Sequence, residues 1–249
     1  DVAETGERHT LFLSFDTRVM AATLGKLRIL CLHGYSMHAS LFAAKMHRVT
    51  RALDDVAEFT FLDAPHEIEP SPAFSGVDLR GLAARAWWRP AKVAHGWLYD
   101  GVEESVDAVA RRHAEMPFDG LLGYSQGAAL VSLLAALSAR EPAHALAPAA
   151  LRAFPPAFVL CAGGFRFNAV DSAYDGVLDG DRPLVDLPSL HVIGRNDAII
   201  RPKLSADLAA CFGPAPATTL EHDNGHVVDH SPGSLDAYRR FLEGFRARP

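Results

Sequence analysis

Short apolar runs alternate with amphipathic stretches along most of the chain. The runs that have the length and composition of buried strands are LRILCL at 27–32, EFTFLD at 58–63, the first half of FDGLLGYSQGA at 118–128, AFVLCAGGF at 157–165, SLHVIG at 189–194 and TTLEH at 218–222. Such strands between helical segments are typical of repeated βα units around a parallel sheet. The pattern predicts an α/β fold with a mostly parallel central sheet flanked by helices.

The segments between these strands show helical spacing of apolar residues. The apolar faces of the expected helices are formed by Phe42, Met46, Val49 and Leu53, by Val102, Val106 and Val109, and by Leu235, Tyr238, Leu242 and Phe245. Residues 128–139 are strongly apolar, as expected of a helix buried against the sheet. Asp100 with Glu103 resembles a capping box. Ser231 is expected to cap the last helix, with Pro232 at its first position.

Residues 64–98 are rich in proline, glycine and aromatic residues and have no clear period. We expect a small lid-like excursion there, because long loops in compact domains are often functional. A second lid or pocket segment is expected at 166–188, within a single domain over 26–249. Residues 1–25 are expected to be an N-terminal extension and have no signal-peptide core. A transit peptide that has already been removed stays an open alternative.

The strongest chemical signal is Gly123-Tyr124-Ser125-Gln126-Gly127, which matches G-x-S-x-G. The motif follows a predicted strand and opens a predicted helix, which is the context of the nucleophile elbow in α/β-hydrolases. The turn is so tight that the residues flanking the serine must lack bulk, and this explains both glycines. We therefore predict Ser125 as a catalytic nucleophile.

A serine nucleophile needs a base, and an acid must orient that base. In α/β-hydrolases the acid follows the serine and the histidine comes last. His226 lies just past the last predicted strand, whereas His191 lies inside a buried strand; His222 is the next candidate base. Asp197 follows the preceding strand and is the predicted acid. The sequence thus indicates Ser125, Asp197 and His226 as a triad.

The oxyanion of an acyl-transfer reaction needs two backbone N–H donors. The residue after the nucleophile, Gln126, is expected to supply one. The loop after the first strand is expected to supply the other, from Tyr35 or alternatively from Ser36. His33, at the end of that strand, is expected to brace this loop rather than carry protons.

Several motifs of this sequence resemble those of a known family. LCLHGY, GYSQGA, Ala86-Trp87-Trp88, LCAGGF, GRND with Ile199 after it, and Gly225-His226 are similar to the FSH family of small serine hydrolases, over about residues 27–245. That family includes esterases and thioesterases that release polyketides from carrier proteins. The resemblance implies an α/β-hydrolase fold, Ser125, Asp197 and His226 as the triad, and no cofactor. Asn224 stands where family members often have a glycine.

An apolar acyl pocket is expected from the aromatic residues of the excursions. Trp87, Trp88 and Phe165 are the predicted substrate-binding residues, and Phe167 is a similar candidate. In the alternative interpretation the tryptophans pack on the core. Arg85 and Arg89 are expected to be solvated, and contact with a carboxylate or phosphate of the substrate is the alternative. A metal cluster of His222, Asp223, His226 and His230 is disfavoured, because Gly225 and Pro232 interrupt a helix there; no metal is predicted.

Composition limits the remaining function classes. The 249 residues are 49% apolar, 22% charged, with net charge −6 and three cysteines. These values favour a small-molecule substrate over nucleic acid or membrane, and the odd, scattered cysteines favour a reducing, cytoplasmic compartment. We predict hydrolysis of short-to-medium acyl esters or thioesters, and a substrate bound to a carrier protein stays open. The alternatives are an acyltransferase with the same triad and a non-catalytic binding protein on this fold.

Overall fold

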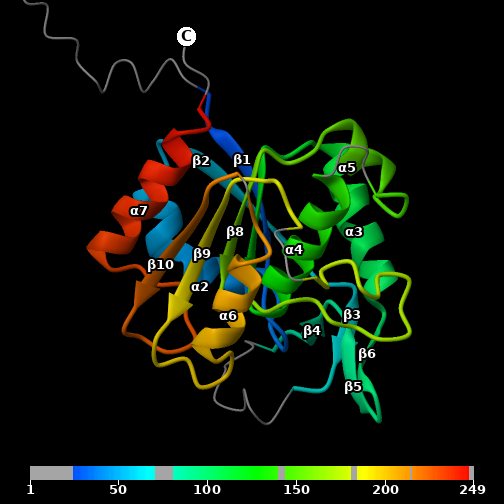
Figure 1. The fold of residues 1–249 in the computed structure, drawn as a ribbon. Coiled ribbons are helices and arrows are strands. Elements are labelled where there is room, and N and C mark those ends of the chain that lie inside the picture. The colour runs from blue at the N-terminus through cyan, green and yellow to red at the C-terminus, as the bar shows by residue number, and fades with distance from the viewer. Residues whose placement is uncertain (1–24, 71–80, 140–143, 181–183, 214, 247–249) are drawn as a thin grey trace, which may run out of the picture.

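The centre of the molecule is a six-stranded sheet in which every neighbouring pair of strands is parallel (Figure 1). The computed structural model describes residues 25–70, 81–139, 144–180, 184–213 and 215–246. Across the sheet the strands run in the order β10 (Ala217–His222), β9 (Ser189–Gly194), β8 (Phe158–Ala162), β7 (Gly120–Tyr124), β1 (Leu27–Leu32) and β2 (Ala57–Leu62). The strands expected from the apolar runs are confirmed, to within a few residues at their ends.

Helices cover both faces of the sheet, which is why its inner strands are continuous apolar runs. On one face lie α2 (Ala39–Ala52) and α7 (Pro232–Glu243); on the other lie α3 (Val102–Glu115), α4 (Gln126–Ser138), α5 (Ala149–Ala153) and α6 (Pro202–Ala209) (Figure 1). Alternate residues of β1 enter separate cores: Leu30 packs with α3 and α4, and Ile29 packs with α2 and α7. The mostly parallel α/β architecture is therefore confirmed.

The helix predictions hold except at two caps. Every residue of α4 is buried, and the apolar faces expected for α2 and α3 are buried as well. The capping box is wrong: Gly101, with φ 89°, is the residue before α3, and Asp100 pairs instead with Arg89 at 2.9 Å. Ser231 does precede α7, with Pro232 at its first position, but its side chain accepts no N–H of the helix; its hydroxyl donates to Asp229 instead.

The excursion at 64–98 contains more regular structure than the sequence indicated. It forms two antiparallel two-stranded sheets, one of β3 (His66–Ile68) with β4 (Ala84–Ala86), the other of β5 (Arg89–Val93) with β6 (Gly96–Asp100). Figure 1 shows them beyond the end of the main sheet toward which β9 and β10 point. Val170 N donates to Trp97 O at 2.9 Å, so the two excursions contact each other at this end of the sheet.

The order of the strands places a crevice between β1 and β7. The chain passes from β1 outward to β2 and then returns to β7, on the other side of β1. The helix after β1 and the helix after β7 lie on opposite faces of the sheet, so the two loops diverge at the carboxyl ends of these strands. In open α/β sheets such a switch point is where ligands bind. The carboxyl ends of β1 and β7 are therefore the expected place for a site.

Cys31, Cys161 and Cys211 are buried and free, and burial raises the pKa of each thiol. The expectation that Cys31 and Cys161 act as small core residues is confirmed. No helix within the described ranges has both the length and the hydropathy that a membrane span requires. Residues 1–24 of the predicted N-terminal extension lie outside the described residues.

Candidate active site

Ser125 stands at the turn between β7 and α4. Its backbone has φ 56° and ψ −118°, a conformation that a residue with a side chain rarely adopts. A Cβ on Gly127 would lie 2.2 Å from Leu32 O, so the helix can start this close to β1 only because that residue is glycine. The strained serine between strand and helix has the geometry of a nucleophile elbow.

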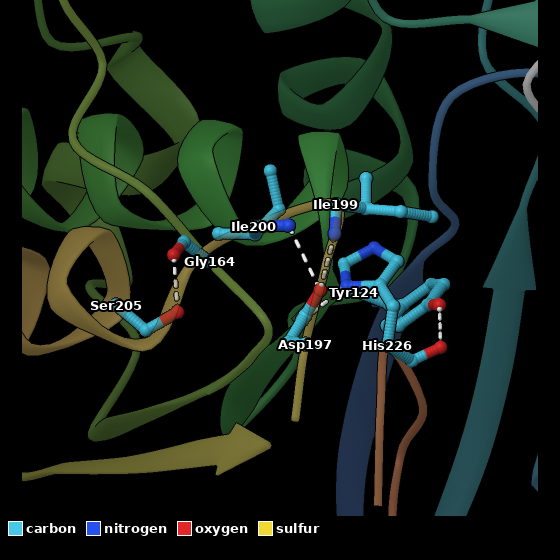
Figure 2. A network of polar contacts seen from close by, with 7 residues as sticks. All are labelled: Tyr124, Gly164, Asp197, Ile199, Ile200, Ser205 and His226. Atoms are coloured by element: carbon cyan, nitrogen blue, oxygen red, sulfur yellow. Dashed lines mark hydrogen bonds and ion pairs between the residues drawn. The ribbon is translucent and has the colours of Figure 1, made fainter. Parts of the chain in front are cut away.

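Asp197 and His226 meet beside this elbow. They lie in the loops after β9 and β10, which are neighbouring parallel strands, so both loops leave the same edge of the sheet. His226 Nδ1 is 2.6 Å from Asp197 Oδ2, and both side chains are almost fully buried (Figure 2). The other oxygen of Asp197, Oδ1, accepts from Ile199 N at 2.9 Å and Ile200 N at 2.8 Å. The carboxylate is therefore fixed in orientation toward the imidazole.

His226 packs directly against the end of the elbow strand. The Tyr124 hydroxyl donates to His226 O at 2.7 Å, and the two ring centroids are 4.8 Å apart (Figure 2). On its other side, His226 Cε1 lies 2.8 Å from where a Cβ of Gly163 would stand. Ser125 N donates to the residue before that glycine, Ala162, at 2.9 Å. Ser125 and His226 thus flank the same short turn after β8.

The outer nitrogen of the imidazole is unpaired in this arrangement. His226 Nε2 is buried and makes no hydrogen bond to any described residue, Ser125 included. Its partner nitrogen, Nδ1, faces the carboxylate of Asp197, which selects the tautomer with the proton on Nδ1. Nε2 is then left free to accept a proton.

A cavity of about 590 Å³ opens at Ser125. Ser125, Gln126 and Tyr35 line it where β1 and β7 end. Aromatic rings and aliphatic side chains form most of its remaining wall. Trp88, Trp97 and Tyr99 come from the segment that ends with β6, Phe165 follows β8, Ile199 and Ile200 follow β9, and Leu204 belongs to α6. Trp88 and Phe165, two of the predicted substrate-binding residues, lie in this wall. Ile200 and Leu204 were not predicted; for Ile200 the apolar pair Ile199-Ile200, close behind Asp197, was a usable signal.

Trp87 does not line this cavity. It is fully buried, and its indole Nε1 donates to His33 O at 2.8 Å. Phe167 is also core, packing edge-on against Trp88 with 5.6 Å between centroids. The two tryptophans lie in the bend between β4 and β5, and of the two only Trp88 lines the cavity. We therefore assign Trp87 to packing and do not propose it as a substrate contact.

Three other buried histidines, His33, His191 and His222, have different surroundings. His33 braces the loop after β1: its Nε2 accepts from Ala64 N at 3.0 Å, and burial lowers its pKa to about 4. His191 is a buried strand residue bonded to Ser189, and its pKa is lowered to about 4 for the same reason. His222 is buried, which lowers its pKa, and neither ring nitrogen has a hydrogen-bond partner among the described residues.

The side chains of the alternative metal cluster point to different partners. His230 Nε2 is 3.0 Å from Arg48 Nη1, whereas His226 faces Asp197. Across the described ranges, no group of three or more histidine, cysteine or acidic side chains is placed to hold a metal ion. The two arginines that were expected to be solvated form ion pairs: Arg85 pairs with Glu67 at 2.8 Å, and Arg89 pairs with Asp100.

The parallel sheet, the strained serine and the buried acid–histidine pair together define the α/β-hydrolase class of protein. Solved structures agree: maize acyl-protein thioesterase 2 aligns with a TM-score of 0.55 at 18% identity, over 89% of this chain and 94% of its own. The esterase PE8 aligns with the same TM-score at 16% identity, over 90% and 94%. At these identities the likeness shows the fold.

Sequence comparison identifies the family. The model "Serine hydrolase (FSH1)" matches residues 21–236. The human protein named esterase OVCA2 is 34% identical over 234 residues, covering 88% of this chain and 96% of the relative; its zebrafish counterpart is 31% identical over 238 residues, covering 88% and 98%. The chain belongs to this family of serine hydrolases. The resemblance drawn from the sequence motifs, and the expectation of an enzyme, are confirmed.

Proposed function

We propose that the protein hydrolyses carboxylic esters of short-to-medium acyl chains, with Ser125 as nucleophile, His226 as base and Asp197 as the acid that orients His226. The observation that carries the proposal is the strained Ser125 at an apolar cavity, beside an imidazole already fixed by a carboxylate at 2.6 Å. The names of the relatives as esterases support the same reaction class. Thioesters are the second substrate class, because the chemistry of their acyl carbon is the same.

The reaction proceeds in two halves. Ser125 Oγ forms a bond to the acyl carbon while its proton passes to His226 Nε2, and His226⁺ then gives this proton to the leaving alcohol as the ester bond breaks. A water molecule next loses a proton to His226 and attacks the acyl-enzyme. The acid is released, and the proton returns to Ser125. Asp197 stays ionised throughout and stabilises the imidazolium. This chemistry requires no cofactor.

The oxyanion donors we propose are the N–H groups of Gln126 and Tyr35. Gln126 is the first residue of α4, so its N–H has no acceptor within the helix. Ser36, the alternative second donor, already donates its N–H to Arg85 O at 3.0 Å. This contact favours Tyr35, the neighbouring residue, which also lines the cavity. The helix dipole of α4 adds partial positive charge at the same place.

The three free, buried cysteines support a reducing compartment, and we propose a cytoplasmic location on that basis. We further propose a free small ester, rather than a carrier-bound thioester, as the first substrate to test.

The test is Ser125→Ala. We expect the variant to fold with an unchanged unfolding temperature and to lose turnover of a p-nitrophenyl ester by ~10⁴-fold or more, because the other triad members have no nucleophile to activate. A fluorophosphonate should label the wild-type protein at Ser125 only, as mapped by mass spectrometry. Near-normal turnover in the variant, or labelling at another serine, would refute the proposal.

A further inference from the structure

Residues 84–88, called here the strap, lie across the ends of β1 and β7. At one end the strap pairs with the loop after β1: Ser36 N donates to Arg85 O at 3.0 Å, and Arg85 N donates to Met37 O at 2.9 Å. These two bonds hold the strap to the residues that directly follow Tyr35. The position of the Tyr35 N–H is therefore tied to the position of the strap.

At its other end the strap is held by the side chain of Gln126. The carboxamide oxygen accepts from Trp87 N at 2.8 Å, and the carboxamide Nε2 donates to Trp88 O at 2.9 Å. Gln126 is 4% exposed. A buried side chain that satisfies both the N–H and the C=O of neighbouring residues fixes their orientation as a neighbouring strand would. The side chain of the first residue of α4 is thus hydrogen-bonded directly to the strap.

The strap has little freedom to move away from these contacts. The Trp87 indole donates to His33 O, and the Ser105 hydroxyl of α3 donates to Trp87 O. Trp87 is fully buried and Trp88 nearly so. Replacing any of these partners leaves a buried polar group unpaired, which costs about 1–3 kcal/mol. The strap is therefore a rigid link between the loop after β1 and the elbow.

We propose that the Gln126 carboxamide is a positioning residue for the oxyanion hole. By clamping the strap, it sets the separation between the N–H groups of Tyr35 and Gln126. The inference rests on the proposed function, since it concerns the donors named there. Oxyanion donors act only within about 2.7–3.1 Å of the developing charge, so a small displacement of one donor lowers the rate without changing the affinity for substrate.

The test uses the pH dependence of Gln126→Glu. A protonated glutamic acid accepts from Trp87 N and donates to Trp88 O, as the amide does. An ionised glutamate still accepts from Trp87 N but faces the Trp88 carbonyl with a negative charge and no donor. Burial raises the pKa of such a carboxyl group. We expect the ratio of variant kcat to wild-type kcat to be highest at about pH 5 and to fall about tenfold or more by about pH 8.5.

Gln126→Met is the matched control, because it removes both hydrogen bonds without adding a titratable group. We expect kcat lower by about 10–100-fold, KM little changed, and a ratio to wild type that is flat with pH. The loss should be equal for acetyl and longer acyl esters, whereas a change of pocket shape through Trp88 would appear as a KM effect on the longer esters.

A flat pH ratio for Gln126→Glu, or a loss confined to KM of longer esters, overturns the inference. Unfolding temperatures measured at each pH show whether the variants are folded. If Gln126→Glu does not fold, Gln126→Met decides the question, since an unchanged kcat overturns the inference and a loss in kcat alone supports it. Ser125→Ala separates this result from the proposed function: if that variant stays active, the proposed function fails, whatever the Gln126 variants do.

Discussion

Asp197 uses both carboxylate oxygens, and each serves a different part of the site. Oδ2 faces His226 Nδ1, while Oδ1 accepts the two N–H groups of the segment that lines the cavity. In Asp197→Asn the amide nitrogen must face either His226 Nδ1 or the two backbone N–H groups. With the amide oxygen on the two N–H donors, His226 is driven to the tautomer that carries its proton on Nε2 and cannot accept from Ser125. We expect kcat to fall by ~10⁴-fold with the fold intact, as steady-state kinetics and circular dichroism would measure.

His222, the other candidate base, supplies a control for the assignment of His226. It is the last residue of β10, is buried, and has no hydrogen-bond partner within the described part of the chain. His222→Ala should lower the unfolding temperature by leaving a cavity but keep most of the turnover. If His222→Ala abolished turnover while His226→Ala did not, the base would be misassigned.

The loop that carries His226 is anchored to α7 through Asp229. The buried carboxylate accepts from Asn224 Nδ2 at 2.7 Å, Ser231 Oγ at 2.5 Å and Ser234 Oγ at 2.6 Å. Burial alone would raise the pKa of Asp229, but these hydrogen bonds outweigh it and lower the pKa. We expect Asp229→Asn to cost about 2–4 kcal/mol of unfolding free energy and to lower kcat, as the loop loosens.

The pH dependence follows from the lowered pKa. The stabilisation by ionised Asp229 is fully present above its unfolded pKa of about 4 and is lost as pH falls through the lower folded value. The stability difference between wild type and Asp229→Asn, from urea unfolding, should therefore shrink below about pH 4. Asp223→Asn is the matched control, because Asp223 is exposed in the same loop and pairs with Arg195 alone among described side chains. An equal loss in both variants would contradict the anchor.

The sequence predicted the elements with long apolar runs and failed where the partners are distant in sequence. β1 and β9 match their predicted ranges because helices on both faces require apolar residues throughout. β5 was missed because most of its residues are exposed, and only pairing with β6 makes it a strand. The cap predicted at Asp100 failed because Arg89, on the strand opposite, pairs with that carboxylate.

In the site, too, some residues could be predicted from the sequence, whereas others depend on partners distant in the chain. Strand order and motif spacing were enough to predict Ser125, Asp197 and His226 as candidates, because Ser125 directly follows one strand of the parallel sheet and the other two lie in the loops after later strands. The choice between Trp87 and Trp88 needed the structure, since it depends on which face of the strap meets His33. The role of the Gln126 side chain likewise depends on a segment 38 residues away.

The cavity wall is assembled from parts that are far apart in the chain, and its apolar character leads to the last prediction. Trp88 lies on one side, stacked on Tyr99 with 4.9 Å between centroids, and Ile199, Ile200 and Leu204 come from the segment after β9. Each methylene of an acyl chain buried there contributes about 0.8 kcal/mol, or about fourfold in kcat/KM. We expect p-nitrophenyl esters to improve from acetyl to medium chain lengths and to fall sharply once the cavity is full.

Trp88→Leu and Trp87→Leu form a matched pair for this prediction, because the two residues are adjacent and almost equally buried but only Trp88 lines the cavity. Trp88→Leu should flatten the dependence of kcat/KM on acyl length and extend it to longer chains, since the removed indole enlarges the space. Trp87→Leu should instead lower the unfolding temperature, because it leaves His33 O without its donor, and should keep the shape of the chain-length profile. A flat profile for the wild-type protein from acetyl to dodecanoyl esters would show that the cavity does not hold the acyl chain. The aromatic residues of its wall would then act only as packing between the excursions and the sheet.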